Sequence, residues 1–313
     1  MVPLNNLEIA KANVERAEAA CDARRYEIAR QCAVDAITAD PNSGDGYASL
    51  GRACLGLQEF EEAEKHFREA YSIDPTDAWY LIGLAISLRC QKNASESLKV
   101  ADELVRLHPL NSRSHEVRGK ALNALKRFAD AKVAFEEAIK LDPENIMAIF
   151  GTGYSLIELK KPKEAEACFR RVLRLDSNNA HALNNLGVSL ENQGNLRDAA
   201  LAYKSAVLLD PTWKTAKKNT TSAVERYLAA GSGISALLFY FAFKVAFQAG
   251  QGKDSISQSA ETIFGVLVVT FVLAAIGIVV YQRSVRGKRR RELESKDPQL
   301  LEIYNTIKRN GED

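Results

Sequence analysis

The chain has 313 residues, of which 46% are hydrophobic and 26% are charged, and its net charge is +2. This composition supports a continuous core, whereas the near-neutral charge argues against a nucleic-acid-binding surface, which needs a basic face of its own. The five cysteines form no C-x-x-C pair and have no metal-ligand spacing with the four histidines. We therefore expect buried, reduced thiols and no metal site.

Residues 1–9 are expected to form a short lead-in. Glu8 and Lys11 interrupt the apolar residues, so the segment lacks the hydrophobic region of a secretory signal peptide. Leu7, Ile9 and Val14 are spaced instead for one face of a leading helix.

Six stretches of 34 residues follow, from Ala10 to Trp213. Each ends in a dipeptide at the same position: Asp40-Pro41, Asp74-Pro75, His108-Pro109, Asp142-Pro143, Asp176-Ser177 and Asp210-Pro211. Because proline lacks an N–H and disfavours helix in the residue before it, a helix is predicted to end at these boundaries. Six copies in register indicate a repeat protein.

Each repeat is predicted to be a hairpin of two helices. In the second copy, apolar residues recur with the helical period on both halves, and Gly56 and Gln58 mark a turn between them. Small residues occur where the helices must approach closely, at Gly51, Ala85, Gly119, Gly153 and Gly187 in the first helices and at Ala29, Ala63, Ala131, Ala165 and Ala199 in the second. Aromatic residues such as Phe67 and Phe135 are expected to fill the gap between the helices.

The period, the small residues and the Asp-Pro endings resemble tetratricopeptide repeats over about 200 residues. The last copy is similar to the family consensus at Leu183, Leu186, Gly187, Gly194, Ala199, Tyr203, Ala206 and Pro211, and departures occur at Ser97, Ala101, Leu104, Pro162 and Ser177. The first copy has Ala17 and Ala33 at consensus positions and is interpreted as a degenerate cap. The resemblance implies an all-α solenoid, a right-handed superhelix of about six helical hairpins.

The resemblance further implies that the first helices line a concave groove that holds a peptide or helix of a partner protein. The candidate groove residues are Arg52, Trp79, Ile82, Ile86, Arg113, Glu116, Lys120, Phe150, Tyr154 and Asn184. Apolar residues of the third and fifth copies would flank a polar band in the fourth, as expected of a peptide anchor. Alternatively, these apolar side chains are covered by the chain's own termini or by a neighbouring turn. A carboxylate clamp found in some family members is absent, because its places hold Val14, Glu18, Trp79 and Gly83.

The sequence contains no recognisable catalytic constellation. The histidines lie singly, and neither an H-E-x-x-H pattern nor a Gly-rich phosphate loop occurs. We therefore expect no enzymatic activity and no cofactor.

The region after the repeats combines a cap with two apolar segments. A capping helix is predicted for 214–230, because an array must cover its last apolar face. Segment 263–281 contains 19 residues without a charge and is predicted to be a transmembrane helix, since it approaches the length that spans the roughly 30 Å hydrocarbon core. Segment 234–247 is also apolar but contains Lys244, so it is either the first arm of a membrane hairpin or an interfacial helix before a single span.

The distribution of basic residues favours the hairpin. Lys and Arg residues precede the first apolar segment and follow the second, whereas Lys253 is the only basic residue of the loop 248–262. The positive-inside tendency then predicts an integral membrane protein whose repeats and basic tail, 282–313, face the cytoplasm. Arg286, Lys288, Arg289, Arg290 and Arg291 are expected to contact lipid headgroups. A helical apolar stripe over 297–309 is open to three interpretations: docking on the chain, lying on the membrane, or binding a partner.

The sequence therefore predicts a membrane-anchored scaffold or adaptor that binds protein partners through its repeats. The alternative is an accessory or regulatory subunit of a membrane protein complex that acts through its transmembrane segments. Homo-oligomerisation is left open by the sequence.

Overall fold

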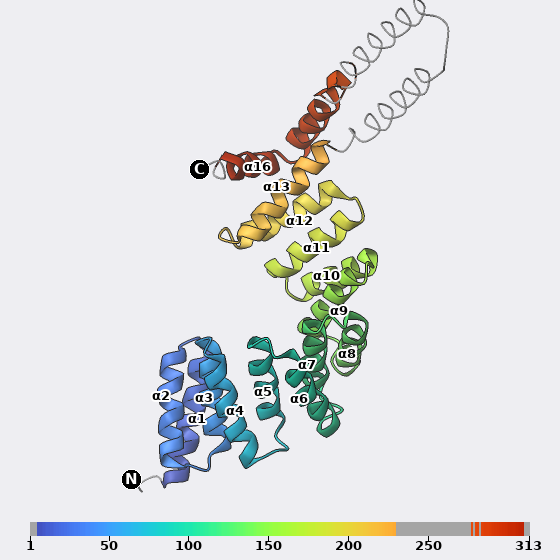
Figure 1. Ribbon diagram of the computed structural model, residues 1–313. Helices are drawn as coiled ribbons and strands as arrows, with labels where there is room; N and C mark the ends of the chain where they lie inside the picture. Colours follow the sequence, from blue (N-terminus) through green and yellow to red (C-terminus); the bar gives the residue numbers. More distant parts are fainter. Residues whose placement is uncertain (1–4, 230–276, 278, 282, 310–313) are drawn as a thin grey trace, which may run out of the picture. The chain divides into compact units, whose positions relative to one another are not determined.

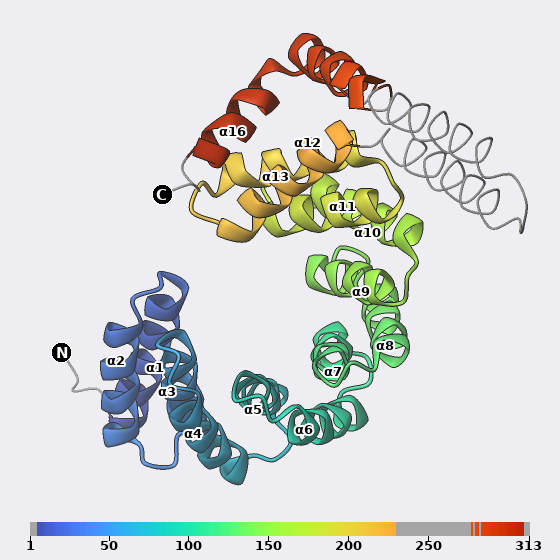
Figure 2. The same ribbon diagram turned by 45° about the horizontal axis from the view of Figure 1, so that its top comes forward.

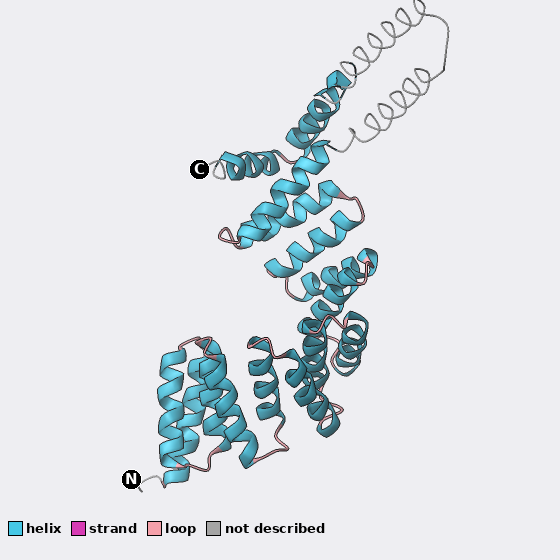
Figure 3. Ribbon diagram, viewed as in Figure 1, coloured by secondary structure: helices cyan, strands magenta, loops and turns pink. Residues whose placement is uncertain are grey.

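The computed structural model describes residues 5–229, 277, 279–281 and 283–309. Within these ranges every regular element is an α-helix, and no strand occurs (Figure 3). The chain divides into two compact units, Met1–Ser177 and Asn178–Asp313.

The first unit is built of consecutive helical hairpins (Figure 1). In chain order its helices are α1 (Asn6–Asp22), α2 (Tyr26–Ala39), α3 (Gly44–Gly56), α4 (Phe60–Ile73), α5 (Ala78–Cys90), α6 (Ala94–Leu107), α7 (Ser112–Ala124), α8 (Phe128–Leu141), α9 (Ile146–Glu158) and α10 (Pro162–Leu175). The first helix begins at Asn6, four residues before the predicted start of the array, because Asn5 and Glu8 form a reciprocal capping box.

The connections between hairpins are closed by side-chain caps. Helix α4 ends at Ile73 and has Asp74 as its C-cap, at the predicted boundary. The Asp74 carboxylate accepts hydrogen bonds from the backbone N–H (2.8 Å) and the hydroxyl (2.7 Å) of Thr76, which lower its pKa. The next helix begins at a side-chain N-cap in each case, namely Ser43, Asp77, Asn111, Asn145 and Asn179. These caps recur every 34 residues and satisfy backbone N–H groups that the first helical turn leaves free.

The turn inside each hairpin contains one residue with positive φ. These residues are Arg24, Gln58, Lys92, Lys126, Lys160 and Gly194, with φ between 55° and 81°. The left-handed conformation suits glycine best, yet only the sixth of these turns has one. The hairpin geometry is therefore imposed on five side chains that do not favour it.

Two layers form in the first unit. The helices α1, α3, α5, α7 and α9 contact one another in succession, and we call them the first-helix layer. The second helices α2, α4, α6 and α8 each contact two members of that layer, and Figure 2 shows α5 and α7 on the inner side of α6 and α8. Because the first helices are the closely spaced ones, their layer is the concave one.

Aromatic rings fill the core between hairpins, as predicted. A Cβ added at Gly51 or Gly83 would lie 2.8 Å or 2.1 Å from the ring of Phe67, so one ring packs against two consecutive first helices. Phe135 lies in the same way against Gly119 and Gly151. The small residues Ala29, Ala63, Ala131 and Ala165 of the second helices are fully buried, which confirms their role at close crossings.

The second unit contains the sixth hairpin, a cap and the tail. Its labelled helices are α11 (Ala180–Asn192), α12 (Leu196–Leu209), α13 (Lys214–Ala229) and α16 (Pro298–Arg309), and residues 283–296 are also helical. Helix α13 packs on α12 at the position predicted for the capping helix.

The tail packs on the repeats. Helix α16 contacts α12 and α13, and its Leu300, Leu301 and Tyr304 are buried, as is Leu293 in the preceding helix. Of the three interpretations of the stripe over 297–309, the structure therefore supports docking on the chain.

Polar contacts hold the tail as well. Lys204 Nζ lies 2.8 Å from Asp297 Oδ1, and both side chains are largely buried. Arg289 Nη1 donates to the carbonyl of Tyr227 at 2.6 Å, and its guanidinium lies 5.2 Å from the centre of the Tyr227 ring. Arg289, predicted to contact lipid, thus contacts α13, whereas Arg286, Lys288, Arg290 and Arg291 are exposed.

Among the described residues, no helix combines the length and the apolar character that crossing a membrane requires. The predicted segment 234–247, the loop 248–262 and residues 263–276 lie outside the described residues.

Candidate partner-binding surface

Nine of the ten predicted groove residues lie on consecutive members of the first-helix layer. Arg52 is on α3, and the third, fourth and fifth repeats contribute the others from α5, α7 and α9. The remaining one, Asn184, belongs to the second unit.

Helix α5 presents apolar side chains that are only partly covered. Trp79, Ile82 and Ile86 are half-buried, and Trp79 packs against Tyr80 with 6.0 Å between ring centres. The Tyr80 hydroxyl donates to Asp45 Oδ1 at 2.7 Å, which joins α5 to α3. Burial and this hydrogen bond raise the pKa of Tyr80, so it remains a neutral donor at physiological pH.

Helix α9 presents a second partly exposed apolar group. Phe150 packs edge-on against Phe169 with 5.4 Å between ring centres, whereas Tyr154 packs against Phe128 at 6.3 Å and is 39% exposed. Met147, about one turn before Phe150 on α9, is 47% exposed. Side chains of this kind gain stability when another chain covers them.

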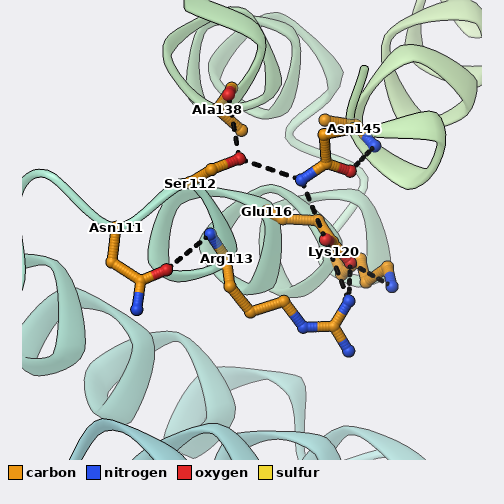
Figure 4. A network of polar contacts seen from close by, with 8 residues as sticks. Asn111, Ser112, Arg113, Glu116, Lys120, Ala138 and Asn145 are labelled. Atoms are coloured by element: carbon orange, nitrogen blue, oxygen red, sulfur yellow. Dashed lines mark hydrogen bonds and ion pairs between the residues drawn. The ribbon is translucent and has the colours of Figure 1, made fainter. Parts of the chain in front are cut away.

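Between these two groups, α7 carries the polar band, Arg113, Glu116 and Lys120 (Figure 4). The Glu116 side chain is 1% exposed and accepts hydrogen bonds from Arg113 Nη1 at 2.7 Å and 2.9 Å. Lys120 Nζ lies 2.6 Å from Glu116 Oε1 on the same carboxylate. Sequence analysis predicted Glu116 as a surface residue, but the two cations and the neighbouring helix cover it.

Two residues that sequence analysis missed complete this network. Asn145 Nδ2 donates to Glu116 Oε2 at 3.3 Å and to Ser112 Oγ at 2.9 Å, and Ser112 Oγ donates to the carbonyl of Ala138 at 2.9 Å. Asn145 also caps α9 by accepting from the N–H of Ala148. The recurrence of Asn, Asp or Ser before each first helix is the sequence signal that would have identified Asn145 as a cap. Its second bond, to Glu116, depends on the packing of α7 against α9.

The charges of the polar band do not cancel. Burial raises the pKa of Glu116, but Lys120 and Arg113 outweigh it, so the pKa of Glu116 is lowered and the carboxylate is ionised. The pKa of Lys120 is lowered by burial, by Arg113 and by Arg89 of α5, against the opposing effect of Glu116. Two cations, Arg113 and Lys120, therefore contact one carboxylate, and Arg89 adds a third positive charge near Lys120.

An open hollow of about 440 Å³ lies where α7 and α9 begin. It is lined by residues of α7, of the turn before α9 and of α9 itself: Asn111, Ser112, Arg113, Glu116, Asp142, Glu144, Asn145, Ile146 and Met147. One wall therefore carries the Arg113–Glu116 pair, and the opposite wall combines apolar side chains with two turn carboxylates.

Two predicted groove residues have partners of their own. Arg52 forms an ion pair with Asp22 of α1 and keeps 37% of its side chain exposed. Asn184 is 7% exposed, and its Oδ1 accepts from Asn219 Nδ2 at 3.0 Å, which joins α11 to the capping helix. The prediction of Asn184 as groove surface is therefore not matched by its position, because α13 covers it.

In the part of the chain that the structure describes, no three His, Cys, Asp or Glu side chains gather closely enough to hold a metal ion. The arrangement on α5, α7 and α9 offers hydrogen-bond donors and apolar surface, which are the means of binding another chain.

Comparison with solved structures shows the same fold. A thermophilic tetratricopeptide-repeat protein from Thermus thermophilus is 20% identical, with a TM-score of 0.52 over 58% of this chain and 98% of its own. PilF of Pseudomonas aeruginosa is 21% identical, with a TM-score of 0.58 over 68% and 97%. PilW, a type IV pilus biogenesis factor, is 16% identical, with a TM-score of 0.61 over 67% and 98%.

No curated protein sequence matches the chain significantly. The tetratricopeptide repeat model, however, matches residues 14–78, 82–146 and 150–213, which together make up more than half of the sequence. The protein therefore belongs to the tetratricopeptide repeat family.

Proposed function

We propose that this protein is a membrane-anchored scaffold whose first-helix layer binds a peptide or helix of a partner protein. Tetratricopeptide repeats are protein-interaction folds. The observation that carries the proposal is the surface formed by α5, α7 and α9, on which half-exposed Ile82 and Phe150 border the cations Arg113 and Lys120. Covering the apolar side chains drives binding, and the charged donors orient the bound chain.

Photo-cross-linking tests the location of this surface. A photoreactive residue replacing Tyr154 on the first-helix layer is compared with one replacing Val133, which is similarly apolar and 54% exposed but lies on α8. We expect a defined cross-linked partner from position 154 and none from position 133. Equal cross-linking from both positions would show that the first-helix layer has no special role.

The second part of the proposal is anchoring by segments 234–247 and 263–281. Their apolar composition supports it. If these segments enter a membrane, the contact between Arg289 and Tyr227 bears on the number of crossings. Tyr227 precedes both segments and Arg289 follows both, so this contact requires the two ends of the intervening chain to be on one side of a membrane. A single crossing of a hydrocarbon core of roughly 30 Å would separate them, so the hairpin is favoured over one span.

The proposed orientation has the repeats and the tail in the cytoplasm, following the basic flanks of the two segments. The exposed cations Arg286, Lys288, Arg290 and Arg291 remain available for anionic headgroups.

Cysteine labelling tests this orientation. In intact cells a membrane-impermeant thiol reagent should label the Ser257→Cys chain but neither the wild type, whose five cysteines all lie in the repeats, nor the Ser295→Cys chain. After lysis the reagent should also label the Ser295→Cys chain, because position 295 is exposed. Labelling of Ser257→Cys only after lysis would contradict the hairpin.

A further inference from the structure

We propose that the partner segment carries an acidic side chain flanked by apolar ones, and that its carboxylate binds Arg113 and Lys120. This inference rests on the proposed function, because it assigns a chemistry to the chain that the first-helix layer would bind. It is carried by the unequal charge of the polar band and by the apolar groups on both sides of that band.

The two cations retain hydrogen-bonding capacity. A guanidinium has five N–H donors and an ammonium three. Among the contacts of the described residues, Arg113 uses its side-chain Nη1 on Glu116, and Lys120 uses Nζ on the same carboxylate. Arg113 keeps 43% of its side chain exposed and Lys120 keeps 24%, so further donors are accessible from the concave side.

A second carboxylate would balance the site. Glu116 supplies one negative charge, whereas its partners Arg113 and Lys120 supply two positive ones. A ligand carboxylate placed on the open side of Arg113 and Lys120 would form charge-assisted hydrogen bonds, which are stronger than those between neutral groups. Partial burial of Lys120 strengthens this attraction, because screening by water is weaker there.

The surroundings exclude a polyanion. Asp142 and Glu144 line the hollow opposite Arg113, so they would repel a nucleic acid or a polyphosphate that extended across it. The apolar side chains Ile146 and Met147 on the same wall suit a protein segment instead.

The spacing of the helices predicts the spacing of the ligand. Neighbouring packed helices lie roughly 8–10 Å apart. A polyproline II segment has three residues per turn and advances about 3.1 Å per residue, so side chains three residues apart lie on one side, about 9 Å from each other. In such a segment running across the layer, the side chains that contact α5 and α9 would therefore lie three residues before and after the acidic one. The predicted pattern is apolar-x-x-acidic-x-x-apolar, with Ile82 and Ile86 on one side and Met147 and Tyr154 on the other.

Selection from a random peptide display library against the purified full chain in detergent tests the pattern. We expect enrichment of Asp or Glu at one position with apolar residues three positions away on each side. The Arg113→Gln and Lys120→Met chains should lose the acidic preference. The Lys99→Gln chain should keep it, because Lys99 lies exposed on α6 and pairs with Glu96.

Removing a charge from the peptide or from Glu116 separates recognition of the acidic side chain from effects on folding. A selected acidic peptide should bind the wild type about tenfold more tightly than its Asn or Gln counterpart, since one charge-assisted contact is lost. Glu116→Gln removes the competing carboxylate and should increase affinity for the acidic peptide but not for the amide peptide. A purely structural role of Glu116 would instead weaken both peptides equally.

The outcomes are decisive in either direction. Two results would overturn the inference: enriched peptides without an acidic preference, or an acidic preference that survives in Arg113→Gln and Lys120→Met. In either case the proposed binding function would still hold if Phe150→Ala abolishes binding of the enriched peptides. No enrichment with any chain would overturn both.

Discussion

The ring of Phe67 on α4 occupies the space that a side chain at Gly83 on α5 would need, since a Cβ there would lie 2.1 Å from Phe67 Cε1. The third repeat reverses these sizes: its second helix has the buried Ala101 and Leu104, and the next first helix has Val117 in place of glycine. Bulk on one helix is thus matched by a small residue on its neighbour, which keeps the core closely packed.

Gly83→Ala should lower the free energy of unfolding by about 1–3 kcal/mol, because the new methyl group overlaps the Phe67 ring. In a Phe67→Ala chain, itself less stable by about 3–5 kcal/mol, the same substitution should cost almost nothing. Urea unfolding of the four chains followed by circular dichroism measures the coupling. Additive effects would show that the two residues do not share this space.

The hairpin turns should respond to glycine according to their positive φ. Lys126→Gly should stabilise the chain by about 0.5–1 kcal/mol, because Lys126 has φ 60° and a side chain disfavours this conformation. Gly194→Ala should destabilise it by about 1 kcal/mol, because Gly194 has φ 81°. Thermal unfolding of the two chains beside the wild type provides the measurement. Shifts of the same sign would contradict the assignment.

Stability should depend on the ionisation of Glu116. Its pKa is lowered from the ordinary 4.5, because the effect of Lys120 and Arg113 exceeds that of burial. As pH falls, the unfolded chain therefore takes up the proton first, so the contribution of the carboxylate is present above pH 4.5 and is lost as pH falls through the lower folded pKa. Glu116→Gln should be less stable than the wild type at pH 7, and the difference should narrow below pH 4.5. A difference that stays constant over urea titrations at these pH values would refute this.

Asp297→Asn should release the tail without unfolding the repeats. Lys204 is 8% exposed and would lose its ionised partner, but departure of the tail would return its ammonium group to water. We expect amide hydrogen exchange in α16 to accelerate roughly tenfold or more, corresponding to a loss of about 1.5–3 kcal/mol for a charged hydrogen bond. Exchange in the core of α12 should change little.

The matched control for the tail is Glu294→Gln. Glu294 lies three residues before Asp297, in the helical segment 283–296, but its ion pair with Arg290 is exposed, so its loss should have little effect on exchange. Equal acceleration in both chains would mean that Asp297 has no specific role in docking.

The sequence predicts which helices carry the site residues, but it does not predict how deeply each side chain is buried. The positions of Trp79, Ile82, Phe150 and Tyr154 on first helices follow from the repeat register, and the structure places them on the first-helix layer. The burial of Glu116 was not predictable, because it depends on Asn145, which is 29 residues away in the chain and on the next hairpin.

The sequence by itself determined the helices, their ends and their pairing into 34-residue hairpins, because capping, proline and apolar period act over a few neighbouring residues. Only the tertiary structure decided that Asn145 of the next hairpin bonds to Glu116, that α13 covers Asn184, and that the tail docks through Leu300 and Asp297. These contacts join residues from different hairpins or from opposite ends of the second unit. Their formation depends on the shape and charge of surfaces that exist only after the hairpins have packed.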